Sequence, residues 1–268
     1  AMPRLPDYPL APDITVSQSI PSSVQATLVV VPVQHLASVL PLLPHAPTLL
    51  CCKGVERSTL AFPLDVLARV RPDLPGAILS GPNFAHEIAM GLPAAAVIAA
   101  PTEQIANALA HLLATPTFRL YASTDCVGVQ LGGAAKNVIA IAAGTAIGAG
   151  LGENARAALV TRGLAEISRL ATVLGGCPTT LAGLSGMGDL VLTCTGAASR
   201  NYQMGLALGR GMTPENATKL LKGVAEGVPT SGAVLALARQ HDVSVPIIET
   251  VSDLLAQSIT LSEAQNRL

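Results

Sequence analysis

The fold is decided by five short apolar runs: TLVVVPV (27–33), TLLCCKG (48–54), AILSGP (77–82), AAAVIAA (94–100) and FRLYAST (118–124). Each run has the length and composition of a strand, and the first two predict strands buried on both faces of a sheet. The segments between the runs predict helices. Strands that alternate with helices indicate an α/β sheet. The expected helices cover 34–43, 58–71, 83–91 and 102–114.

Long helical patterns replace the strands after about residue 127. In 154–174, apolar side chains line one helix face and charged side chains line another. The change in pattern predicts an α/β domain over residues 1–127 and an all-α domain over residues 128–268. Further helices are expected over 201–209, 214–222, 228–241 and 247–257.

The composition excludes several classes of protein. Half of the residues are hydrophobic and 12% are charged, so the chain is not disordered. A net charge of −1 and only six Tyr and Phe residues argue against a nucleic-acid partner. The odd number of cysteines and the lack of a signal sequence predict reduced thiols in a cytoplasmic protein. The cysteines are Cys51, Cys52, Cys126, Cys177 and Cys194.

Residues 128–152 raise the alternative of a membrane-spanning helix. The run contains one charge, Lys136, and is long enough to cross a bilayer of ~30 Å. However, no aromatic belt or Lys/Arg cluster flanks it, and much of it is Ala and Gly. A helix buried inside a soluble protein is therefore the favoured interpretation.

Generic catalytic motifs are missing from the sequence. It has no H-E-x-x-H, and its five histidines are scattered, so no metal site is predicted. It has no P-loop and no G-x-G-x-x-G after a strand.

Polar residues instead follow the predicted strands. Lys53 follows the second strand, and Gly81, Pro82 and Asn83 follow the third. Ligands of open α/β sheets bind outside the carboxyl ends of the strands, so these residues are candidate site residues. The alternatives are a solvated loop lysine and a simple turn, with Asn83 as the N-cap of the helix over 83–91.

Lys136 lies in an apolar helix and has no acidic residue within ten positions. A buried ammonium needs a partner or a lowered pKa, and a lysine with a lowered pKa is a candidate general base. Asp189 could supply the opposite charge. Ser199, Arg200 and Asn201 precede a predicted helix and could bind an anion. The alternatives are a snorkelling lysine at the helix edge and an ordinary N-cap.

Five exact strings, in this order and spacing, resemble NAD(P)-dependent glycerol-3-phosphate dehydrogenases of the bacterial type. The resemblance extends from near residue 5 almost to the C-terminus. The strings are CCKGVE (51–56), SGPNFAHE (80–87), GVQLGGAAKNVIAI (128–141), GLSGMGDLVLTCTGAASRN (183–201) and VAEG (224–227).

The resemblance implies a role for each matching residue. Lys136 matches the proton acceptor, and Asn83 stands where the family usually has Ser or Thr. The implied substrate contacts are Lys53, Gly81, Asn83, Lys136, Asp189, Ser199, Arg200 and Asn201. The implied cofactor contacts are Lys53, Ala85, Arg200, Val224 and Glu226.

The resemblance also implies a Rossmann-like domain, NAD or NADP as cofactor, and a homodimer. The implied reaction interconverts glycerol 3-phosphate and dihydroxyacetone phosphate and supplies phospholipid synthesis. Because no strand with a Gly-rich turn precedes residue 27, the sequence predicts that the family's N-terminal dinucleotide-binding unit is missing. We then expect poor dinucleotide binding, and the alternative function is a catalytically silent protein that binds a phosphorylated metabolite.

Overall fold

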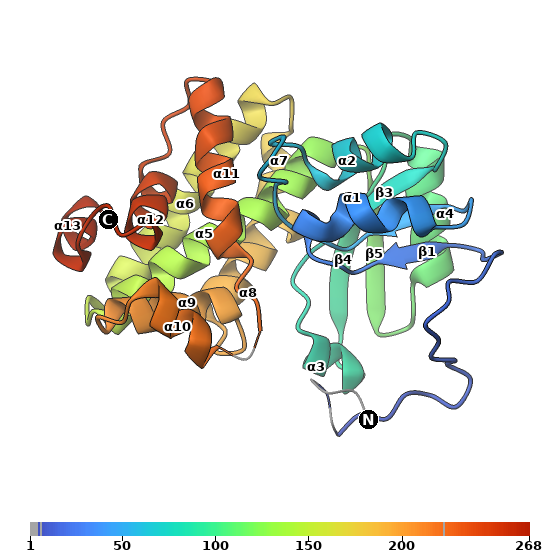
Figure 1. The fold of residues 1–268 in the computed structure, drawn as a ribbon, viewed down its shortest axis with the longest axis horizontal. Coiled ribbons are helices and arrows are strands. Elements are labelled where there is room, and N and C mark those ends of the chain that lie inside the picture. The colour runs from blue at the N-terminus through green and yellow to red at the C-terminus, as the bar shows by residue number, and fades with distance from the viewer. Residues whose placement is uncertain (1–4, 6, 222) are drawn as a thin grey trace.

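The first half of the chain forms a five-stranded sheet with the strand order β1-β2-β3-β4-β5 (Figure 1). The computed structural model describes residues 5, 7–221 and 223–268. All neighbouring strands are parallel except β3 and β4, which are antiparallel. The expected α/β architecture is confirmed. The strands are β1 Thr27–Val29, β2 Thr48–Leu50, β3 Gly76–Ser80, β4 Ala94–Ala99 and β5 Phe118–Ser123.

Successive residues of a strand point to opposite sides of the sheet, so both faces present apolar side chains. Helices cover both faces and bury these side chains. In β2, Leu50 packs into a cluster with α1 and α2, whereas Leu49 packs into a cluster with α4. Both side chains are fully buried. The helical segments of this half are η1 Val33–His35, α1 Leu36–Val39, η2 Leu40–Leu42, α2 Pro63–Val70, α3 Ala85–Ala89 and α4 Glu103–Leu113.

Two expectations for this half are wrong. Strand β1 is not buried on both faces, because it has one neighbouring strand, and Leu28 is 49% exposed. Asn83 is not a helix cap: α3 begins at Ala85, and Phe84 occupies its N-cap position. The Asn83 side chain is thus free for another role.

The second half is helical and surrounds the 23-residue helix α5. Among the described residues, α5 alone is long and apolar enough to be a candidate membrane span, and 89% of its most apolar stretch is buried inside the protein. It is the core helix of this half. The helices are α5 Cys126–Gly148, α6 Gly152–Val173, α7 Pro178–Ala182, the π-helical turn η3 Leu184–Gly188, α8 Asp189–Thr195, α9 Arg200–Gly209, α10 Pro214–Leu220, α11 Gly227–Gln240, α12 Pro246–Leu255 and α13 Leu261–Arg267.

Small residues allow α9 to lie directly against α5. A Cβ atom on Gly205 of α9 would lie 2.1 Å from the carbonyl oxygen of Ile141 in α5. One on Gly144 of α5 would lie 2.2 Å from the carbonyl oxygen of Tyr202. The close contact brings the start of α9 beside the middle of α5, where Lys136 lies. The helix expected over 214–222 corresponds to α10, and residue 222 lies outside the described residues.

Candidate active site

A cleft of about 480 Å³ lies between the sheet and the helical half. The sheet contributes the segments that follow the carboxyl ends of its strands, including Val30, Lys53 and Asn83. The helical half contributes Lys136 from the middle of α5 and Arg200 from the start of α9. The cleft therefore occupies the place where ligands bind to open α/β sheets.

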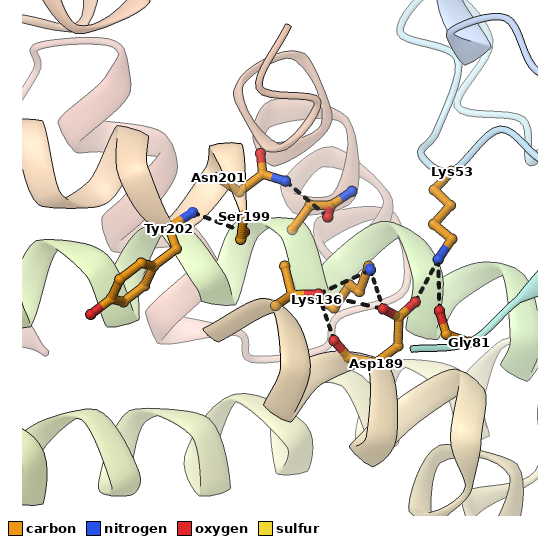
Figure 2. A network of polar contacts seen from close by, with 9 residues as sticks. Lys53, Gly81, Lys136, Asp189, Ser199, Asn201 and Tyr202 are labelled. Carbon is orange, nitrogen blue, oxygen red and sulfur yellow. Dashed lines mark hydrogen bonds and ion pairs between the residues drawn. The ribbon is translucent and has the colours of Figure 1, made fainter. Parts of the chain in front are cut away.

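Two lysines that line the cleft share one carboxylate (Figure 2). Asp189, the first residue of α8, is buried, and its Oδ2 lies 2.5 Å from Nζ of Lys53. Its Oδ1 accepts a hydrogen bond from Nζ of Lys136, which is also buried. Lys53 donates a second hydrogen bond, of 3.3 Å, to the carbonyl oxygen of Gly81. When both lysines are protonated, the three side chains carry one excess positive charge, which favours an anionic ligand.

The surroundings of Lys136 lower the pKa of its ammonium group to about 7. Burial is the largest cause, because it penalises the charged form, and repulsion by Lys53 acts in the same direction. Attraction by Asp189 opposes both. Burial also disfavours the charged form of Asp189, but the two ammonium groups together hold its pKa below the usual value. Lys136 can therefore gain and lose a proton near neutral pH.

Thr193 completes the surroundings of Lys136 and was not predicted from the sequence. Its hydroxyl lies 3.0 Å from Nζ of Lys136 and donates to the carbonyl oxygen of Asp189. Thr193 follows Asp189 by one helical turn, so the i,i+4 spacing in α8 was a usable signal. The hydrogen bonds of Thr193 fix the direction in which the amine points.

Asn201 belongs to a chain of hydrogen bonds between three helices. Its Nδ2 donates to Oδ1 of Asn137, and its Oδ1 accepts from the main-chain nitrogen of Gly227, both at 2.9 Å. One N–H of its side chain remains for a ligand. Asn137 is a second residue that was not singled out from the sequence, although it is adjacent to Lys136.

Asn83 lines the sheet side of the cleft, and Gly81, two residues earlier, contacts Lys53. Gly81 has a φ of 154°, and a Cβ atom there would lie 2.8 Å from Cα of Ala96, so only glycine fits without strain. Oδ1 and Nδ2 of Asn83 are both buried and have no hydrogen-bond partner in the described part of the chain. A buried, unpaired amide is costly, and a ligand in the cleft can satisfy it.

Ser199 and Arg200 lie at the start of α9. The Ser199 hydroxyl accepts a hydrogen bond of 3.2 Å from the main-chain nitrogen of Tyr202, so Ser199 is the N-cap of α9. Arg200 is exposed and lines the cleft. The cap interpretation and the anion-site interpretation are compatible, because the Ser199 hydroxyl can still donate a hydrogen bond.

The remaining predicted residues also line the cleft. Ala85 and Val224 are exposed, and Glu226 is half-buried. Burial raises the pKa of Glu226, and the charges of Arg200, Lys53 and Lys136 oppose this shift. Nine of the eleven residues predicted from the sequence therefore border the cleft. The other two, Gly81 and Asp189, contact Lys53 directly.

The burial of the two lysines argues against the alternatives for them. Lys136 is 7% exposed and lies in mid-helix, so it does not snorkel to solvent. The Lys53 side chain is 19% exposed and is held by Asp189, so it is not a solvated loop lysine.

Comparisons with known proteins place the chain in a family. Residues 3–106 match the family profile described as NAD-dependent glycerol-3-phosphate dehydrogenase N-terminus, and residues 125–266 match the profile of the C-terminus. The expectation that the N-terminal unit is missing is therefore not borne out. That expectation relied on the absence of one Gly-rich motif. The N-terminal profile, in contrast, matches the chain from before β1 into α4.

Relatives with known names agree with the profiles. Glycerol-3-phosphate dehydrogenase (NAD(P)+) of Gluconobacter oxydans is 54% identical over 100% of this chain and 84% of its own length. The Acidiphilium cryptum enzyme of the same name is 53% identical over 99% and 82%. The crystal structure of glycerol-3-phosphate dehydrogenase from Coxiella burnetii superimposes with a TM-score of 0.85 at 38% identity, over 91% of this chain and 76% of that one. The chain belongs to the NAD-dependent glycerol-3-phosphate dehydrogenase family.

Proposed function

We propose that this protein interconverts sn-glycerol 3-phosphate and dihydroxyacetone phosphate with NAD or NADP. The observation that carries the proposal is the buried Lys136, held by Asp189 and Thr193 in a cleft that also contains Lys53 and Arg200. A polar cleft with excess positive charge suits a small phosphorylated substrate. The family relationship supports the enzyme over a catalytically silent binding protein.

Lys136 is the acid–base group of the proposed mechanism. In the oxidation of glycerol 3-phosphate, its neutral amine accepts the proton of the C2 hydroxyl. In the reverse direction, its ammonium returns that proton to the oxygen. A pKa of about 7 allows both protonation states at neutral pH, as efficient general acid–base catalysis requires. Asp189 and Thr193 orient the amine, and Lys53 stabilises negative charge that develops on the C2 oxygen.

Arg200 and the start of α9 bind the substrate phosphate in this mechanism. The guanidinium can donate two parallel hydrogen bonds to phosphate oxygens, and the first main-chain N–H groups of α9 add positive potential. Asn201 offers its remaining N–H to the substrate. Binding of the distant phosphate holds C2 beside Lys136, which converts binding energy into orientation.

The residues of the cleft fit a nicotinamide dinucleotide. Val30, Val31 and Val224 provide apolar surface, whereas Glu226 and Lys53 provide polar contacts. The unpaired amide of Asn83 can satisfy its hydrogen bonds with a ligand in the same cleft. The bound cofactor supplies the acceptor or donor of the hydride at C2.

A direct assay tests this proposal. The purified chain is mixed with dihydroxyacetone phosphate and NADH or NADPH, and the loss of reduced nicotinamide is followed by absorbance. We expect turnover with at least one of the two cofactors, and a loss of at least ~100-fold when Lys136 is replaced by Met. Binding of dihydroxyacetone phosphate in calorimetry without any turnover would instead identify a silent binding protein.

We further propose that the protein acts in the cytoplasm as a homodimer, with its domain boundary at residue 127, and that its product supplies phospholipid synthesis. Free thiols at all five cysteines support a reducing compartment, and the change from strands to helices after β5 supports the boundary. The family resemblance supports the dimer and the metabolic role. Light scattering of the purified chain measures the mass that distinguishes a dimer from a monomer.

A further inference from the structure

Gln34, in η1 after strand β1, connects two segments that border the cleft. Its Nε2 donates a hydrogen bond of 2.8 Å to the carbonyl oxygen of Val55. Its Oε1 accepts one of 3.1 Å from the main-chain nitrogen of Arg57. We propose that Gln34 is a positioning residue of the active site: it holds the segment after Lys53 and so keeps the ammonium of Lys53 against Asp189.

The segment that carries Lys53 needs such support. Residues 51–62, between β2 and α2, form no helix or strand, and a lysine loses rotamer freedom when its side chain is fixed. Gly54 follows Lys53 with a φ of 131°, and a Cβ atom there would lie 3.0 Å from both Val33 and Thr230. Close packing against Val33 and Thr230 therefore confines the backbone at Gly54. The two hydrogen bonds of Gln34 hold the residues that follow.

A second set of contacts, centred on Glu56 between the two residues that Gln34 binds, also holds the segment. The buried Glu56 carboxylate accepts a hydrogen bond of 2.7 Å from Arg69 of α2 and another from Thr59. These contacts fix residues 56–59 to α2. Gln34 is different because it joins the segment to the stretch after β1, in which Val30 and Val31 border the same cleft.

The position of Lys53 matters because its charge acts on Lys136. Repulsion by Lys53 is, after burial, the largest cause that lowers the pKa of Lys136. Among the described residues, Asp189, Glu226 and the thiol of Cys194 also interact electrostatically with Lys136. None of these is bonded to Gln34. Gln34 nevertheless lines a small cavity with both Lys53 and Glu226, so a comparison with Lys53→Met is needed to show that a change at Gln34 acts on Lys136 through Lys53.

This inference rests on the proposed function, because it assumes that Lys136 is the acid–base group. Gln34→Met keeps the length of the side chain and removes both hydrogen bonds. We expect kcat/KM for glycerol 3-phosphate oxidation to fall about tenfold, since small misplacements of active-site groups can cost up to ~100-fold. We also expect the acidic limb of the kcat–pH profile to move to higher pH, because weaker repulsion raises the pKa of Lys136.

Gln130→Met is a matched control. Gln130 of α5 makes the same pair of bonds, accepting from the main-chain nitrogen of Leu64 at 2.8 Å and donating to the carbonyl oxygen of Cys126 at 3.0 Å. It does not line the cleft. We expect Gln130→Met to lose stability without a shift of the pH profile. An equal shift in both variants would overturn the inference.

A double variant separates this inference from the proposed function. If Gln34 acts through Lys53, adding Gln34→Met to Lys53→Met should cause little further loss, whereas independent effects would multiply. If Lys53→Met alone keeps full activity, the proposed role of Lys53 is wrong. If Lys53→Met is impaired and the two losses multiply, only the role of Gln34 is wrong.

Gln34→Glu keeps the inference testable if Gln34→Met does not fold. The carboxylate can still accept the hydrogen bond from Arg57 but cannot donate to Val55. We expect a kcat/KM between those of the wild type and of Lys53→Met. A value equal to that of the wild type would show that the bond to Val55 does not position Lys53.

Discussion

Lys53 and Asp189 form an ion pair of 2.5 Å that joins the two halves of the protein. Lys53 follows strand β2 of the sheet, whereas Asp189 begins helix α8 of the helical half. Since Asp189 also accepts from Lys136, the relative position of the halves controls the charge next to the proposed acid–base group.

Replacing Lys136 by Met should abolish most of the activity. The variant keeps the apolar stem of the side chain and removes the amine that gains and loses the proton. We expect kcat to fall by at least ~100-fold, the usual cost of losing a general acid–base group. Lys219→Met is the control, because Lys219 is exposed and, among the described residues, pairs only with Glu215 on the same helix. Near wild-type turnover of the Lys136 variant would exclude this role.

The oxidation of glycerol 3-phosphate should lose rate as the pH falls below about 7, the pKa of Lys136. Only the neutral amine can accept a proton, and it disappears below its pKa. In Asp189→Asn, the attraction that raises the pKa of Lys136 is removed, so the acidic limb should move to lower pH. A kcat–pH profile of each protein gives the position of the limb. A shift to higher pH would contradict the assignment.

Arg200→Lys should weaken the binding of glycerol 3-phosphate although the charge is kept. A lysine cannot reproduce the two parallel hydrogen bonds of the guanidinium. We expect KM to rise about tenfold or more, the cost of one lost hydrogen bond to a charged group. Glycerol has no phosphate and serves as the control substrate. Equal losses for both substrates would mean that Arg200 does not contact the phosphate.

Gly205→Ala should destabilise the helical half. The new Cβ would lie 2.1 Å from the carbonyl oxygen of Ile141, so α9 must move away from α5. We expect the free energy of unfolding to fall by about 1–3 kcal/mol or more in urea titrations. Gly232→Ala is the control: it lies in α11, and the nearest atom to its Cβ would be Oγ of Ser252 at 4.0 Å. It should be neutral or stabilising by up to about 1 kcal/mol.

Glu166 should make the stability depend on pH. Glu166 is 2% exposed, and its carboxylate accepts hydrogen bonds from the main-chain nitrogens of Ile247 and Ile248, at 2.8 and 3.2 Å. Burial raises the pKa of Glu166 although these donors oppose the shift. The protonated form is thus favoured in the folded state, and stability is lost as the pH rises through the raised pKa.

The comparison with Glu166→Gln isolates this effect, because glutamine does not titrate. Between pH 4 and pH 7, the wild type should lose unfolding free energy relative to the variant. Urea titrations at several pH values measure the difference. A wild type that gains stability relative to the variant over this range would show that the backbone donors outweigh the burial of Glu166.

Local patterns predicted most of the elements. The apolar runs at 48–54 and 94–100 became β2 and β4 because their residues suit buried strands wherever they lie in the sheet. The pattern did not predict the antiparallel direction of β4 or the exposure of Leu28 in β1. Both depend on which strands are neighbours, and periodicity contains no information about neighbours.

The sequence by itself determined that Lys136 is an isolated charge in an apolar helix and must find a partner. Only the tertiary structure decided that this partner is Asp189 and that Lys53, 136 residues away from Asp189 along the chain, shares it. The isolation is local, because it depends on residues within a few helical turns. Which residues pair with Lys136 depends on how the sheet packs against the helices. Many contacts between residues that are far apart in the sequence determine that packing.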